Sequence, residues 1–388
     1  MSEPPQLRLF RTDPAASTSA ADIAAAFDTG RLTQARQLAG LTKAALAAMV
    51  GVSGAAVSQW ESRTSPPRPD HVVKLGEALD VPIDFFAVGR PFAQLDGSGA
   101  HFRSLRSTRV GQRARAVAFV EQVWELTYAL EKLVQFPAVD LPGFLPDDQS
   151  RLPGSPVEAA RALRAHWGVG TGPIRHLIRT METRGIVTTM VPFAAGDTAT
   201  IDAFSTSRMP RPLIVLTPDR GTDVYRHRFT AAHELGHLIL HRDAAPGDAE
   251  QEREADAFAA EFLTPADSIC PQLPTRVDFG AFELISREWE VSVKSLIYRC
   301  QELGTISEAA ARRAYQQHNK RMALGFIIEE PARSFVGETP AMLNAAFDMA
   351  VQTGTTTMSD LARELRWRQS RLRLLLGRED ERPVLTLV

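Results

Sequence analysis

The residues with the clearest chemical potential lie at 233–237, where the sequence reads His-Glu-Leu-Gly-His. Because residues four apart share one face of a helix, His233 and His237 can point both imidazoles at one metal ion. Glu234, one step round the helix, can reach the open side of that ion and act as a base toward an attacking water. This pattern arises by chance in only about one chain in a hundred of this length, so we predict a catalytic metal site with Glu234 as its general base.

A third ligand is expected from a second helix, over residues 249–263, which carries several acidic side chains. Glu252 can complete a His-His-Glu set, and Asp256, one turn further on, can accept the other N–H of a ligand histidine and fix its tautomer. Glu254 lies about 200° round the helix from Glu252 and is the weaker candidate for the third ligand. Three protein ligands leave one position open, which is typical of a catalytic Zn²⁺ site, with Mn²⁺ as the alternative metal.

The alternative to a metal site is an amphipathic helix that carries two histidines by chance, beside a second helix with a solvated acidic face. His241 follows His237 by four residues and continues the same helix face. It could support a ligand histidine, but we favour a simpler role as a cation at the helix C-terminus, where the macrodipole is favourable. With a metal bound, the arrangement favours amide hydrolysis, in which Glu234 passes a proton from water to the leaving amine.

Apolar residues recur with helical spacing over residues 224–241 and 249–263, so both ligand helices are expected to have a buried face. Upstream, three short β-branched segments bounded by Gly and Pro predict strands at 186–191, 200–204 and 213–217. We therefore expect a central α+β region with a small sheet. The remainder is expected to be mainly α-helical, with an amphipathic helix over 117–133 and further helices over 278–388.

Five short helices are expected between residues 28 and 86, and those at 42–50 and 53–61 have helix-turn-helix spacing around Gly51 and Val52. The side chains expected to face the major groove of operator DNA are Ser53, Gly54, Ala55, Ser58 and Gln59. The cations expected to contact phosphate are Arg36, Lys43, Arg63 and Arg68. Residues 30–90 carry only seven Lys and Arg against five Asp and Glu, so we expect a homodimer on double-stranded DNA. The alternative is a plain helical bundle used for protein contacts.

Composition restricts the remaining classes of function. The chain has 388 residues with 44 Lys and Arg against 46 Asp and Glu, a net charge of −2, which excludes binding to nucleic acid or membrane by bulk charge. Its two cysteines, Cys270 and Cys300, exclude a disulfide scaffold and fit a reducing compartment. The sequence shows neither a signal peptide nor an apolar run of about 18 residues, so we expect a cytoplasmic protein without membrane contact.

Residues 31–86 resemble the XRE (Cro/C1-type) helix-turn-helix family. The resemblance lies in Leu41-Thr-Lys-Ala-Ala-Leu-Ala, in Val50-Gly-Val-Ser-Gly-Ala-Ala-Val-Ser-Gln-Trp-Glu and in Leu79-Asp-Val-Pro-Ile-Asp-Phe-Phe. The family usually has Glu-x-Gly where this chain has Glu61-Ser62-Arg63, so we expect the turn after the recognition helix to be made differently.

Residues from about 157 to 300 resemble the ImmA/IrrE metallopeptidases, in Arg228-Phe-Thr-Ala-Ala-His-Glu-Leu-Gly-His and Glu252-Arg-Glu-Ala-Asp-Ala-Phe-Ala-Ala-Glu-Phe-Leu-Thr-Pro. The family often has Asn where Asp256 stands here. The resemblance implies a zincin-like core with His233, His237 and Glu252 as ligands and Glu234 as base. It also implies cleavage of a protein, typically a repressor, in response to mobile elements or to DNA damage, for which single-stranded DNA is one candidate signal.

The predicted fold class is a multidomain, mainly α chain with an all-α helix-turn-helix bundle, a central α+β zincin-like domain and a helical C-terminal region. The expected divisions are a mobile tail over 1–29 that becomes helical at its end, from about Ile23, the DNA-binding domain over 30–88, a linker and amphipathic helix over 89–155, the metallopeptidase domain over 156–300, and a helical sensor or partner domain over 301–388.

Three functions are compatible with these features. The leading hypothesis is a DNA-binding regulator whose zinc endopeptidase domain cuts a partner repressor or the chain itself in a stress or phage-defence response. The second is a non-proteolytic regulator whose metal-binding domain is a sensor or partner-binding scaffold. The third is an antitoxin-like regulator with a protein interface in residues 290–388. An intact Glu234 favours the first, because a structural zinc site does not need a general base.

Overall fold

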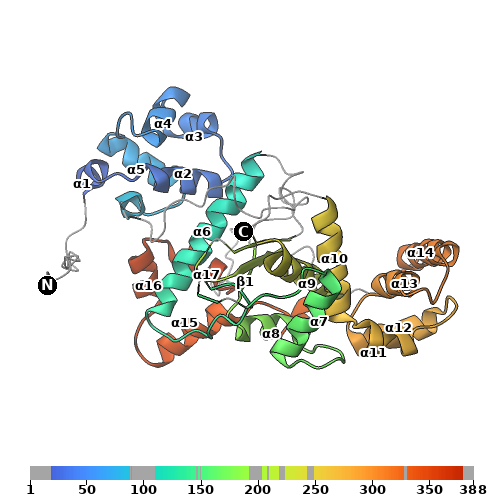
Figure 1. Ribbon diagram of the computed structural model, residues 1–388. Coiled ribbons are helices and arrows are strands. Elements are labelled where there is room, and N and C mark those ends of the chain that lie inside the picture. Colours follow the sequence, from blue (N-terminus) through green and yellow to red (C-terminus); the bar gives the residue numbers. More distant parts are fainter. Residues whose placement is uncertain are drawn as a thin grey trace, which may run out of the picture. The chain divides into compact units, whose positions relative to one another are not determined.

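The computed structural model describes residues 19–87, 89, 110–145, 147–148, 150–191, 203–207, 209–217, 223–242, 249–326 and 330–378 (Figure 1). Within these residues the chain is mainly α-helical, with one three-stranded sheet. It divides into two compact units, one of Met1–Arg90 with Arg366–Arg368 and one of Pro91–Leu365 with Gln369–Val388. No helix among the described residues is long and apolar enough to cross a membrane.

The first unit consists of short helices, drawn in blue in Figure 1. They are α1 (Ala20–Ala25), α2 (Thr29–Leu38), α3 (Lys43–Val50), α4 (Gly54–Glu61), α5 (Pro69–Ala78) and the 3-10 helix η1 (Ile83–Ala87). The side chains of Thr42 and Ser53 cap α3 and α4 by accepting hydrogen bonds from backbone N–H groups. Between these helices Gly51 takes a φ of 78°, a left-handed conformation that glycine adopts without strain. The helix-turn-helix pair is therefore fixed by local sequence.

The predicted mobile tail is too long at its C-terminal end. Ser19 and Asp22 form a capping box that starts α1, and Ile23 of this helix is buried. Helix α1 packs against α5 and η1, so residues from 19 onward belong to the folded unit. The rest of the predicted tail, residues 1–18, lies outside the described part of the chain.

The second unit contains the sheet, in the order β1-β3-β2. Strand β1 (Val187–Met190) pairs in parallel with β3 (Leu213–Leu216), and β2 (Ala203–Thr206) pairs antiparallel to β3. The predicted strand at 200–204 is thus shifted: β2 begins at Ala203 and continues to Thr206, while residues 200–202 lie outside the described residues. Strands β2 and β3 are buried along their whole length, so their uniformly apolar or small side chains fit a covered sheet.

The two expected ligand helices pack closely on each other. Helix α9 (Val224–Leu240) and helix α10 (Ala249–Leu263) agree with the predicted ranges to within one residue. A Cβ at Gly236 of α9 would lie 3.0 Å from a ring carbon of Phe258 and 3.3 Å from the Cα of Ala255. The missing side chain at this position therefore allows α10 to approach α9, which brings acidic residues of α10 near the histidines of α9.

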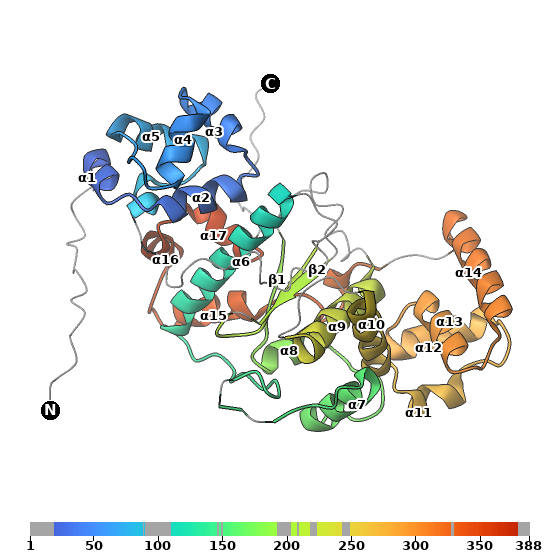
Figure 2. The same cartoon turned by 45° about the horizontal axis from the view of Figure 1, so that its top comes forward.

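Helix α9 contacts β2 and β3. Helix α10 packs against α9 and also against α7 (Pro156–Trp167). Figure 2 shows α9 and α10 on one side of the sheet and α6 (Val110–Glu131) on the other. Helix α6 was predicted to be amphipathic, but its buried residues include consecutive positions from Ala116 to Val120, so it is covered on all faces of that stretch. The helices that pack around this part of the unit are α8 (Leu177–Thr183), α15 (Met342–Gln352), α16 (Met358–Leu365) and α17 (Gln369–Leu375).

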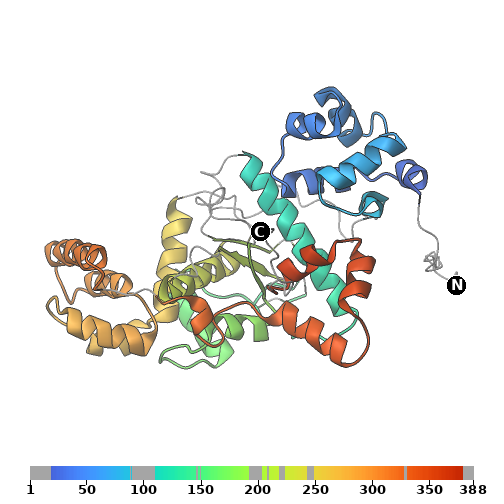
Figure 3. The ribbon, with the colours of Figure 1, turned by 180° about the vertical axis from the view of Figure 1, so that it is seen from behind.

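Beyond α10, on the side away from the sheet, the chain forms a group of helices seen from behind in Figure 3. They are α11 (Ala266–Ile269), the 3-10 helix η4 (Cys270–Gln272), α12 (Phe279–Trp289), α13 (Val293–Glu302) and α14 (Glu308–Ala323). The segment with the 3-10 helix η5 (Ala332–Ser334) then returns to α8 and α9, where Glu338 accepts a hydrogen bond from the N–H of Leu177 at 2.8 Å and pairs with buried Arg228. The division predicted at residue 300 stays a prediction; the residues on both sides of it belong to the second compact unit.

Candidate metal centre and DNA-binding surface

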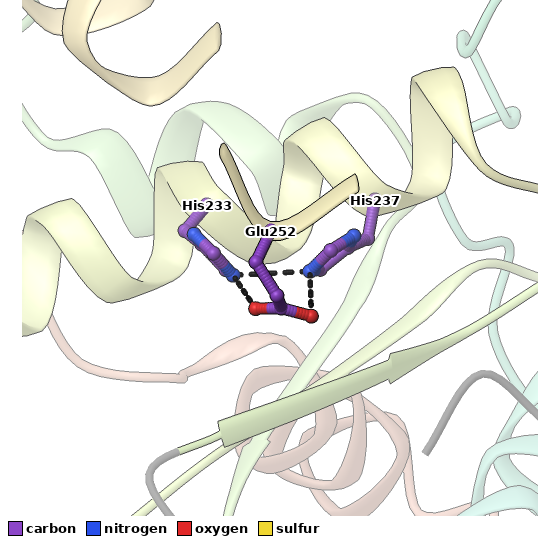
Figure 4. A group of neighbouring side chains, drawn as sticks. All are labelled: His233, His237 and Glu252. Carbon is purple, nitrogen blue, oxygen red and sulfur yellow. Dashed lines mark hydrogen bonds and ion pairs between the residues drawn. The ribbon is translucent and has the colours of Figure 1, made fainter. Parts of the chain in front are cut away.

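Three side chains from α9 and α10 converge on one point (Figure 4): His233, His237 and Glu252. One ligand atom from each lies within 4.8 Å of the other two. The Nε2 atoms of the histidines are 3.0 Å apart, and the carboxylate oxygens of Glu252 lie 3.4 Å from Nε2 of His233 and 3.7 Å from Nε2 of His237. The structure thus brings together the residues expected to be ligands, from two helices that are adjacent because of Gly236.

These distances fit a zinc ion. Ligand atoms at 2.0–2.2 Å around a tetrahedral Zn²⁺ are separated by roughly 3.3–3.6 Å. The two Nε2 atoms are somewhat closer than this, at 3.0 Å, and each carboxylate oxygen of Glu252 lies 3.4 or 3.7 Å from a different histidine, so a small outward shift of the imidazoles admits the ion. The side chain of His237 is only 3% exposed, whereas that of Glu252 is 44% exposed, so the cluster is covered on the His237 side and open on the Glu252 side. Among the described residues, the cluster is therefore accessible to solvent from the Glu252 side.

Asp256 lies behind the first histidine. Its Oδ1 is 2.8 Å from Nδ1 of His233, so that nitrogen donates its N–H to Asp256, and Nε2 is the atom that faces the cluster and can bind a metal once it has lost its own proton. Burial disfavours the charged form of His233, but hydrogen bonds to Asp256 and Glu252 outweigh it and raise the pKa of His233 to about 10. Hydrogen bonds from His233 and His237 hold the pKa of Glu252 well below its usual range. The site is therefore electrostatically suited to a cation.

Glu254 is occupied elsewhere. Its Oε2 lies 2.7 Å from Nε2 of His241, and Nδ1 of His241 lies 3.0 Å from Nδ1 of His237. The expectation that His241 acts as a simple helix-terminal cation is therefore wrong: it is a buried hydrogen-bonding partner of a candidate ligand. Since Glu254 faces His241, the geometry favours Glu252 as the third ligand.

Glu234 is held by a residue that sequence reasoning missed. The hydroxyl of Ser205, on β2, donates to Oε2 of Glu234 at 2.7 Å, and both residues are buried. Ser205 lies 29 positions before Glu234 in an ordinary buried strand, and nothing in its local sequence marks it. Only the packing of β2 against α9 places it there.

The expected base-reading residues lie on and before helix α4. Ser53, Ala55 and Gln59 are exposed, whereas Ser58 is half-buried. The hydroxyl of Ser53 caps α4, so part of its hydrogen-bonding capacity is already used within the protein. These positions leave an exposed helix face at the point where a recognition helix is expected.

The expected phosphate contacts differ among themselves. Arg36 donates through Nε and Nη2 to the two carboxylate oxygens of Glu61 at 2.6 and 3.1 Å, and its side chain is only 12% exposed. Its assignment as a phosphate contact is therefore wrong, because this guanidinium joins α2 to α4. Lys43 also lies near Glu61, at 3.3 Å, but its side chain is 45% exposed, and Arg68 is 74% exposed.

The turn after α4 is made in the conformation that glycine usually supplies. Arg63 takes a φ of 62°, which is left-handed, so the expectation of a different turn is wrong. A residue with a Cβ is strained there by about 1–2 kcal/mol. Its Nε donates to the hydroxyl of Thr29 at 3.3 Å, which ties the turn to the start of α2.

Comparison with known families agrees with this geometry. A peptidase-family model described as the IrrE N-terminal-like domain matches residues 181–301, and a helix-turn-helix family model matches residues 32–86. No curated protein matches the chain. The chain therefore joins an XRE-type helix-turn-helix domain to a metallopeptidase-like domain of the IrrE kind. Both resemblances drawn from the sequence are confirmed.

Proposed function

We propose that this protein is a DNA-binding transcriptional regulator with a zinc-dependent endopeptidase domain, which cleaves a partner repressor or itself in a stress, DNA-damage or phage-defence response. The observation that carries the proposal is the convergence of His233, His237 and Glu252. Glu234 follows His233 directly in the sequence of the same helix. Three ligands and an adjacent carboxylate are the requirements of a hydrolytic centre. The match to the peptidase family supports the same class of reaction.

In the proposed mechanism, His233, His237 and Glu252 would hold the metal, and a bound zinc would supply Lewis-acid activation of water and of the substrate carbonyl. Glu234 takes a proton from the attacking water on one of its carboxylate oxygens and delivers it to the leaving amine. The hydrogen bond from Ser205 to Oε2 holds this carboxylate in place. Asp256 orients the imidazole of His233.

The second candidate function, a non-proteolytic regulator that uses the metal domain as a sensor or scaffold, requires the ligands but does not require Glu234. A Glu234→Gln variant separates the two, because it keeps the shape of the site and removes the base. We expect cleavage of the partner to fall by a factor of about 10²–10⁴, with zinc content and operator DNA binding retained. If regulation and partner cleavage in cells are unchanged in this variant, the peptidase proposal is wrong.

The helix-turn-helix domain is proposed to bind a double-stranded operator as a homodimer, with Ser53, Ala55, Ser58 and Gln59 toward bases and Lys43 and Arg63 toward phosphates. The weak net charge of this region supports dimerisation, because a single copy would make few phosphate contacts.

A further inference from the structure

His241 and Glu254 form a chain of hydrogen bonds behind the candidate ligand His237. The Nδ1 atoms of His237 and His241 are 3.0 Å apart, and Nε2 of His241 lies 2.7 Å from Oε2 of Glu254. The side chain of His241 is 4% exposed and that of Glu254 is 36% exposed. This series of hydrogen bonds therefore runs from the covered side of the site to the surface of α10. It joins the end of α9 to the start of α10.

We propose that His241, oriented by Glu254, is a positioning residue that fixes the tautomer and ring orientation of His237; this rests on the metal site of the proposed function. Two imidazole nitrogens 3.0 Å apart share one proton, so one must donate and the other accept. The carboxylate of Glu254 requires an N–H on Nε2 of His241, which leaves Nδ1 of a neutral His241 as the acceptor. His237 then carries its proton on Nδ1, and its Nε2 lone pair faces His233 and Glu252.

The geometry excludes a role for His241 as a further ligand in this arrangement. Its Nδ1 faces Nδ1 of His237, on the opposite side of that ring from the nitrogen that points into the cluster. The Nδ1 atom of His233, on the side away from the cluster, is held by Asp256, whose side chain is 52% exposed. The two ligand histidines are therefore held by different means: His233 directly by an exposed acid, and His237 through a buried imidazole.

The test is zinc affinity of the full-length chain, measured by competition with a chelator at one fixed pH. In His241→Leu the side chain cannot accept the hydrogen bond from Nδ1 of His237, so zinc binding should weaken about 10–100-fold. His241→Asn places an amide oxygen near the position of Nδ1 and should recover most of that loss. Glu254→Leu leaves the imidazole in place without its anchor and should cause a smaller, severalfold loss. His166→Asn is the matched control, because His166 also pairs with a carboxylate, Asp140, at 2.5 Å, but on α7.

If His241 had only a structural role, the zinc affinities of His241→Leu, Glu254→Leu and His241→Asn would not follow this order. Nitrogen NMR shifts of the zinc-free parent should show neutral His237 with its proton on Nδ1, and His241→Leu should show a mixture of the two tautomers. If His241→Leu does not fold, His241→Asn and Glu254→Leu carry the test, with folding checked by circular dichroism. Equal affinity in the parent, in His241→Leu and in Glu254→Leu would overturn the proposal while leaving the metal site intact. A parent chain that binds no zinc would overturn both this proposal and the proposed function.

Discussion

The metal centre and the helix-turn-helix unit use their charged side chains in opposite ways. In the metal centre, His233 and Glu252 direct donor atoms at a common point, and the groups behind them, such as Asp256, hold those donors in place. In the helix-turn-helix unit, Arg36 lies against Glu61 of the same unit, which joins α2 to α4. In the first region the charged groups therefore converge on a candidate metal position, whereas in the second region the pair of Arg36 and Glu61 stabilises the fold. The difference shows that a charged residue on a functional element need not contact the partner.

The largest effect is expected at the metal centre. His237→Ala should abolish stoichiometric zinc binding, because it removes the most buried of the three donors. Glu252→Gln should weaken binding strongly, whereas Glu254→Gln should retain about one zinc per chain at saturating metal, because Glu254 faces His241. Elemental analysis of the purified variants checks this. Loss of zinc in Glu254→Gln with retention in Glu252→Gln would reverse the assignment of the third ligand.

Within α9, a third histidine, His227, differs from the two candidate ligands. His227 is fully buried, and burial lowers its pKa to about 4, whereas that of His233 is raised. The unfolded chain therefore binds a proton between pH 6.5 and 4 that the folded chain does not, so stability is complete above pH 6.5 and is lost as pH falls toward 4. The contribution is about 3 kcal/mol on an order-of-magnitude basis.

We expect His227→Leu to reduce the acid-dependent loss of stability over this range relative to the parent, both measured free of metal by denaturant unfolding. Identical slopes for the parent and His227→Leu would mean that His227 is not held neutral by burial.

The chemistry within one helix could be predicted from sequence, and the contacts between elements could not. The spacing of His233 and His237 defines one face of a helix, and Glu252 and Asp256 are one turn apart on the next, so their relative directions follow from helix geometry. The contact of Ser205 with Glu234 depends on how β2 packs on α9, and no spacing encodes it.

Two errors have the same cause. His241 was assigned from its position at a helix end, but its partner Glu254 comes from another helix. Arg36 was assigned from its charge, but Glu61 stands 25 residues away in the sequence and adjacent in the fold. Each pairing depends on tertiary packing, which a local pattern does not contain.

The pairing of Arg36 can be separated from DNA contact. Arg36→Gln should lower the free energy of unfolding of the helix-turn-helix unit by about 2 kcal/mol, less than the loss of a fully buried pair because some solvent reaches it. The salt dependence of operator binding should stay unchanged in the folded fraction. Arg68→Gln is the matched variant: we expect a stability change within about 0.5 kcal/mol and a salt slope reduced by about 1. A reduced slope in Arg36→Gln would restore Arg36 as a phosphate contact.

The smallest effect is expected at Arg63. The backbone conformation at this position favours glycine, whereas the proposed phosphate contact requires the arginine side chain. Its φ of 62° costs stability that glycine would not, so Arg63→Gly should raise the free energy of unfolding by about 1 kcal/mol. If its exposed guanidinium contacts phosphate as we propose, the same change should weaken operator binding and reduce the salt slope by about 1. Arg63→Ala separates the effects, because it removes the cation but keeps the strained backbone. We expect equal loss of DNA affinity in the two variants and added stability in Arg63→Gly alone. Equal stabilities would argue against strain, and an unchanged salt slope would show that Arg63, like Arg36, serves the fold and does not contact DNA.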